Sequence, residues 1–62
     1  MNRVIVKGYD LREGDVLSEN MKPGRTIEAV LPARQRGYLV ARFTDGSQKG
    51  LGHNTTEVWV YR

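Results

Sequence analysis

Cysteine is absent from the 62 residues, and histidine occurs once, at His53. The chain therefore has no disulfide, no thiolate metal site and no cysteine nucleophile, and one histidine alone cannot hold a structural zinc ion. Wholly aliphatic runs reach only three residues, as at 4–6 and 29–31. Such runs are too short for a membrane-spanning helix or for the core of an export signal. We therefore expect a cytoplasmic protein that has no contact with membranes.

The short length predicts one domain, residues 1–62, near the lower size limit for folding without disulfides or a structural metal ion. A chain of this size buries only about 60% of the surface that its unfolded form exposes. Its stability must come from a small apolar core, supplemented where needed by self-association or a partner.

Charge is distributed unevenly along the chain, whose formal net charge is +3. Residues 10–19 are acidic on balance, whereas residues 20–42 hold five lysines and arginines against a single glutamate. A basic excess suits a polyanionic partner. A mixed-charge surface that keeps the protein soluble explains the same composition.

Turn residues recur at short intervals, and no segment keeps an apolar period of 3.6 residues. This punctuation predicts an all-β fold with at most one helical turn, placed within 12–20. Asp45-Gly46 predicts a hairpin turn, and Pro23-Gly24 predicts the end of a polar loop over 18–24. Strands are expected at 2–7, 16–17, 25–32, 38–44, 47–51 and 55–61.

Alternation along these strands assigns the core. In the third strand, Ile27, Val30 and Leu31 fit no single alternation, which predicts a bulge or a strong bend. Bends of this kind let a five- to six-stranded antiparallel sheet curl over itself and hide its edges. We therefore expect a small, closed, SH3-like barrel. The predicted core residues are Ile27, Leu39, Ala41, Phe43, Leu51, Val58 and Val60, with Val4 or Val6.

Four segments carry a resemblance to a known group of proteins. They are D-L-R-E-G-D-V-L (10–17), G-R-T-I-E-A-V (24–30), L-V-A-R-F-T-D-G (39–46) and E-V-W-V (57–60). Together they resemble small SH3-like barrel proteins encoded by actinobacterial phages. The resemblance implies the barrel fold and, for a phage protein, the cytoplasm of a bacterial host. It carries over no catalytic or binding residue.

Aromatic and basic side chains supply the first candidate binding residues. Alternation places Tyr38 with Arg42 on the outer face of one strand, and Trp59 with Tyr61 on the outer face of another. If both strands lie on the same side of the barrel, these four residues form one patch. Aromatic rings beside arginines stack on exposed bases, and they also anchor protein interfaces. Alternatively, Trp59 covers one open end of the core.

Arg34 and Arg36 supply the second candidate, at the tip of the hairpin over 33–37. Two arginines separated by Gln35 could straddle a phosphate backbone while the glutamine reaches a base edge. A solvated, charged hairpin tip is the alternative interpretation.

Two further segments resemble sites but are better explained as turns. Residues 50–56 contain glycines and a histidine, yet no helix follows to present its amides to an anion. The carboxylates of Asp10, Glu13 and Asp15 could ligate a hard cation, but their spacing favours capping of backbone amides. We therefore expect no metal and no cofactor.

These observations favour a non-enzymatic binding module. The leading hypothesis is an accessory protein that acts through protein–protein contacts, with either a different partner or a second copy of itself. The alternative is a DNA- or RNA-binding barrel that uses the basic tip and the surface aromatics. Phosphate contacts weaken steeply with added salt, so the salt dependence of binding distinguishes the nucleic-acid hypothesis from the protein-binding hypothesis.

Overall fold

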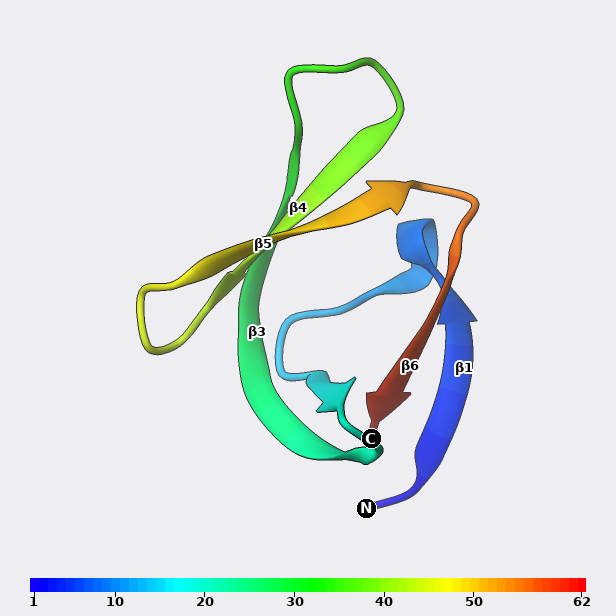
Figure 1. The fold of residues 1–62 in the computed structure, drawn as a ribbon, viewed down its shortest axis with the longest axis vertical. Coiled ribbons are helices and arrows are strands. Elements are labelled where there is room, and N and C mark those ends of the chain that lie inside the picture. Colours follow the sequence, from blue (N-terminus) through cyan, green and yellow to red (C-terminus); the bar gives the residue numbers. More distant parts are fainter.

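The computed structural model describes residues 1–62 as one antiparallel sheet with almost no helix (Figure 1). The strands are β1 (Arg3–Lys7), β2 (Val16–Glu19), β3 (Lys22–Pro32), β4 (Tyr38–Phe43), β5 (Gln48–His53) and β6 (Glu57–Tyr61). The predicted all-β class is confirmed. The only helical segment is the 3₁₀ turn η1 (Gly8–Asp10), and no helix has the length to cross a membrane.

The strands lie in the order β1-β6-β2-β3-β4-β5. Strand β6 returns between β1 and β2, so the two termini lie side by side, and Asn2 and Arg62 exchange backbone hydrogen bonds of 2.8 and 3.0 Å. Strands β1 and β5 each have a neighbour on one side only. The sheet is therefore open, and the predicted closure into a barrel is not found.

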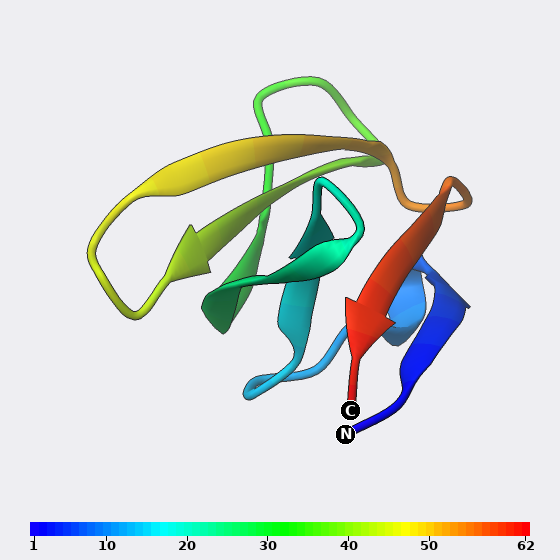
Figure 2. The same ribbon diagram turned by 60° about the horizontal axis from the view of Figure 1, so that its bottom comes forward.

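The longest strand, β3, bends and joins the two halves of the sheet (Figure 2). Its first half pairs with β2 and its second half with β4. The register with β4 shifts between Ile27 and Ala29, so Glu28 is the extra residue of a bulge. The predicted irregularity of this strand is thus confirmed. The bulge lets Ile27 and Val30 both pack on the core, although three positions separate them.

The core fills the space between the two halves of the sheet. Ile27, Phe43 and Val60 are the largest side chains without solvent contact. Most of the predicted core is confirmed: four of its residues are buried and Val4, Val6, Leu51 and Val58 pack around them, whereas Leu39 is half-buried and outside this cluster. Sequence alternation did not assign Val16 and Leu17, which are adjacent and both buried, because β2 is too short to show a period. The buried apolar residues are Val16, Leu17, Ile27, Ala41, Phe43 and Val60, with Val4, Val6, Leu11, Val30, Leu51 and Val58 packed around them.

The predicted polar loop over 18–24 is wrong. Glu19 and Lys22 face each other across a two-residue turn, Asn20-Met21, whose φ angles are 54° and 61°. The Pro23-Gly24 pair belongs to β3 instead, near its start, where a missing proline N–H is tolerated. The predicted position of the single helical turn, within 12–20, is also wrong, because the turn lies at η1.

Candidate functional site

Trp59 lies on the outer face of β6, and 42% of its surface is exposed. Its cross-strand partner on β1, Ile5, is exposed to the same extent, 42%. The Arg3 guanidinium stacks 4.1 Å from the centre of the Trp59 ring, and its Nε donates to Ser18 Oγ at 3.4 Å. A cation over an indole face is attracted by the ring quadrupole, so Arg3 holds the exposed indole in place. We call Arg3, Ile5 and Trp59 the Trp59 surface.

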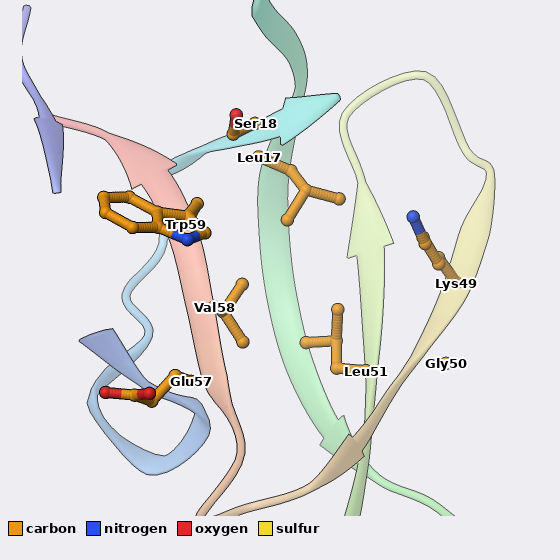
Figure 3. Close-up of a pocket in the computed structure, with 8 residues that line it drawn as sticks. All are labelled: Leu17, Ser18, Lys49, Gly50, Leu51, Glu57, Val58 and Trp59. Atoms are coloured by element: carbon orange, nitrogen blue, oxygen red, sulfur yellow. The ribbon is translucent and has the colours of Figure 1, made fainter. Parts of the chain in front are cut away.

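A groove of about 240 Å³ opens beside Trp59, between β6 and β5 (Figure 3). It exists because β2 pairs with β6 only at Val16 and Leu17, beyond which the two strands separate. Aliphatic side chains from three strands point into the groove, while Lys49 and Glu57 stand on opposite sides of it (Figure 3). The lining residues are Leu17, Ser18, Lys49, Gly50, Leu51, Glu57, Val58 and Trp59.

The groove suits one or two apolar side chains of a partner. Sites for small molecules commonly measure about 300–1,000 Å³ and enclose most of the ligand. This groove is smaller, with an aliphatic floor formed by Leu17, Leu51 and Val58. Its edge carries one charge of each sign, together with a large exposed aromatic ring. Such a combination of anchor pocket and aromatic rim is typical of protein interfaces.

Four of the predicted binding residues, Tyr38, Arg42, Arg34 and Arg36, lie elsewhere. Tyr38 and Arg42 are on β4, which belongs to the other half of the sheet, and the inner faces of the two halves pack against each other. Their outer faces therefore point apart, and the single aromatic and basic patch does not form. Tyr38 packs edge-on against His53, with 5.5 Å between ring centres, and Arg42 Nε pairs with Glu28 at 3.1 Å.

Arg34 and Arg36 lie on the connection between β3 and β4, and both side chains are exposed. Neither forms an ion pair or a side-chain hydrogen bond. Figure 1 shows this connection at the opposite end of the molecule from the chain termini. The tip is thus free, but it is separate from the Trp59 surface.

Tyr61 is half-buried and has a structural contact. Its hydroxyl donates to the backbone carbonyl of Met21 at 3.0 Å, which ties the end of β6 to the turn between β2 and β3. The aromatic ring predicted to bind a partner therefore also supports that turn.

Arg25 looks like a free cation in the sequence, but it is fully engaged. Its guanidinium pairs with Glu19 at 2.7 Å, donates to Ser47 Oγ at 3.0 Å, and stacks 4.1 Å from the centre of the Phe43 ring. Its hydrogen bonds to Glu19 lower the pKa of that carboxyl and raise the pKa of Arg25. Arg25 thus joins β2, β3 and the turn after β4 and leaves no charge for a ligand.

Asp15 has a structural role as well, and only 5% of its side chain is exposed. It accepts the Arg12 backbone N–H at 2.9 Å, as the capping interpretation predicted, and it pairs with Arg62 Nε at 2.9 Å. The carboxylate therefore anchors the C-terminal residue. No three His, Asp or Glu side chains come together in an arrangement that could hold a metal ion.

Comparison with other proteins adds no assignment, since no family model, curated protein or solved structure matches this chain.

Proposed function

We propose that this chain is a non-enzymatic protein-binding module, and that its docking site is the groove between β5 and β6 together with Trp59. The observation that carries the proposal is the adjacency of an exposed indole, stacked under Arg3, and a small aliphatic pocket. Trp is the residue most enriched among interface hot spots, where it pairs with fully desolvated pockets. A partner would insert an apolar side chain between Leu51 and Val58 and cover the Trp59 ring.

Charge supports a protein partner over a nucleic acid. A backbone-binding surface needs several free cations along one path. Near Trp59, the neighbouring strand β1 supplies only two cations without an ion pair, Arg3 and Lys7. The free arginines of the tip, Arg34 and Arg36, lie away from Trp59, and Arg42 is paired with Glu28. The groove itself is bordered by Lys49 and Glu57, which nearly cancel each other. Nucleic acid binding is the outcome that a steep salt dependence would reveal.

We extend the proposal to the fold family. The strongly bent β3, shared by two sheet halves that pack face to face, supports an SH3-like arrangement in which β1 is an added edge strand. A phage-type accessory protein that acts by occupying a surface fits such a compact frame.

A random peptide library displayed on a carrier tests the docking site. We expect enriched peptides to shift the Trp59 emission to the blue on binding. Trp59→Ala and Leu51→Ala should each weaken the binding of the same peptides by about tenfold or more, since hot-spot truncations commonly cost at least 2 kcal/mol. Tyr38→Ala is the matched control, because Tyr38 is an exposed aromatic, 36% accessible, on the other half of the sheet.

Equal losses in Trp59→Ala and Tyr38→Ala would contradict the assignment of the site. A different result is that the library enriches no peptide, while the protein binds single-stranded DNA or RNA with an affinity that falls steeply between low and moderate salt. That result would replace the protein-binding proposal with the nucleic-acid hypothesis.

A further inference from the structure

Strand β1 is an open edge whose backbone groups point away from the sheet. Asn2 exchanges two backbone hydrogen bonds with Arg62, and the Gly8 N–H donates to Thr56 at 2.9 Å. In an antiparallel pair, every second residue bonds to its partner strand. The backbone groups of Val4 and Val6 therefore also face β6. Those of the intervening residues, Arg3, Ile5 and Lys7, face the open edge.

The β1 edge has no bulge, no proline and no covering segment, and its only protections against pairing are its short length and the two cations Arg3 and Lys7. Natural proteins cover exposed edges or disrupt them with bulges and prolines. The register of β1 with β6 is unbroken from Arg3 to Lys7, and Figures 1 and 2 show no segment beyond β1. The other edge, β5, contains a register shift around Leu51, between two glycines. A further strand would thus fit β1 better than β5.

The residues with free backbone groups also present a charge pattern. Arg3 and Lys7 flank Ile5 on the outer face, all three are exposed, and neither cation forms an ion pair. The Arg3 guanidinium lies over the Trp59 ring and donates its Nε to Ser18, and its two terminal nitrogens form no hydrogen bond, so Arg3 must turn toward the edge to pair with an added strand. Opposite charges directly across a strand pair stabilise it, whereas like charges destabilise it.

This pattern argues against a second copy of the chain at the same edge. Two β1 strands paired antiparallel about Ile5 would place Arg3 opposite Lys7 of the second copy, twice over. Both contacts would be repulsive. A strand with acidic residues at those two positions would instead be attracted.

We propose that the β1 edge accepts an extended segment of another protein as a seventh, antiparallel strand. The segment carries an apolar residue opposite Ile5 and an acidic residue opposite each of Arg3 and Lys7, in the pattern acidic-x-apolar-x-acidic. Main-chain hydrogen bonds supply the affinity and the flanking charges supply the specificity, as in other cases of strand addition. The inference rests on the proposed protein-binding role for the class of partner, but it uses different atoms from the groove.

A blocked peptide, acetyl-Ser-Glu-Thr-Val-Thr-Glu-Ser-amide, is the probe. Ile5→Pro and Ile5→Ala both remove the isoleucine side chain, but only proline also removes the outward N–H, which has no partner in the fold. We expect Ile5→Pro to bind the peptide about tenfold more weakly than Ile5→Ala. Leu51→Ala, in the groove, should bind it like the wild type, so failure of the groove proposal and failure of this one are distinguishable.

Hydrogen exchange on the wild-type protein gives a second readout, which needs no variant to fold. The amides of Arg3, Ile5 and Lys7 should exchange fast in the free protein and slow when the peptide is added, while those of Val4 and Val6 are slow throughout. Replacing both peptide glutamates by lysine should weaken binding and remove the protection.

The inference is overturned by equal affinity of Ile5→Pro and Ile5→Ala, by protection of all five β1 amides before peptide is added, or by equal binding of the glutamate and lysine peptides. A dimer that Ile5→Pro dissociates would also overturn it, by showing that a second copy occupies the edge.

Discussion

The turn between β2 and β3 contains a residue whose type conflicts with its backbone conformation. Met21 has a φ of 61°, in the left-handed region that side chains with a Cβ disfavour, and 74% of its surface is exposed. Two-residue hairpin turns with positive φ at both positions favour Asn-Gly. Met21→Gly creates that sequence. The hydrogen bond from the Tyr61 hydroxyl is retained, because it goes to the backbone carbonyl of residue 21.

The expected gain follows from two opposing terms. The left-handed conformation costs an L-residue roughly 1–2 kcal/mol. Glycine gains about 0.4–1 kcal/mol of conformational freedom in the unfolded chain, which offsets part of the relief. Since the Met21 side chain is mostly exposed, little burial is lost. The free energy of unfolding should therefore rise by about 0.5–1 kcal/mol, and the melting temperature by about 2–8 °C for a domain of this size.

Urea titration and thermal melting, followed by circular dichroism, measure this gain. Met21→Ala is the control, because it removes the same side chain but keeps the unfavourable φ, and it should not be stabilised. If Met21→Gly is no more stable than Met21→Ala, the turn is not strained and the reasoning fails. If Met21→Gly is more stable but binds selected peptides less well, Met21 is retained for contact and not for stability.

Other predictions concern the core, pH and the basic tip. Phe43→Ala should lower the free energy of unfolding by about 3–5 kcal/mol, comparable to the whole stability of so small a domain, and a cooperative urea transition in this variant would contradict its central place in the core. The pKa of Glu19 is lowered by its hydrogen bonds to Arg25, so its stabilising contribution is complete above the ordinary pKa of a glutamate and is lost as pH falls through the lowered value of the folded state. Urea midpoints of the wild type should therefore drop on acidification, and those of Glu19→Gln should drop less. Replacing Arg34 and Arg36 together by alanine should leave the free energy of unfolding within about 0.5 kcal/mol of the wild-type value. A larger loss would show that the two side chains make stabilising contacts and are not free.

Local patterns in the sequence predicted the structure correctly along cleanly alternating strands and at the Asp45-Gly46 turn. Asp45-Gly46 forms the predicted turn because Gly46 takes a φ of 88° and the Asp45 carboxylate accepts the Ser47 N–H at 2.8 Å. In β4, Ala41 and Phe43 point inward as alternation requires. These features depend on neighbouring residues only, so one sequence contains the information.

Features that depend on pairing between strands far apart in the sequence could not be predicted from local patterns. Nothing in the alternation of β6 states that it lies between β1 and β2, and this placement keeps β1 at an edge and leaves the sheet open. Likewise, the bend in β3 was predicted, but not its consequence for the outer faces. That bend turns the Tyr38 face and the Trp59 face in different directions, so the six predicted binding residues are divided among separate regions.

Gly24 illustrates why a correct local rule gave a wrong prediction. A Pro-Gly pair is a strong turn signal, yet here the glycine is needed for a distant reason. A methyl group at this position would overlap the Glu19 carboxylate, which folds back across β3 to pair with Arg25. The glycine therefore makes room for the ion pair, and the ion pair removes Arg25 from the cations that were counted as available for a phosphate backbone. The basic excess over residues 20–42, which was counted from composition alone, therefore overstates the free positive charge in the middle of the chain.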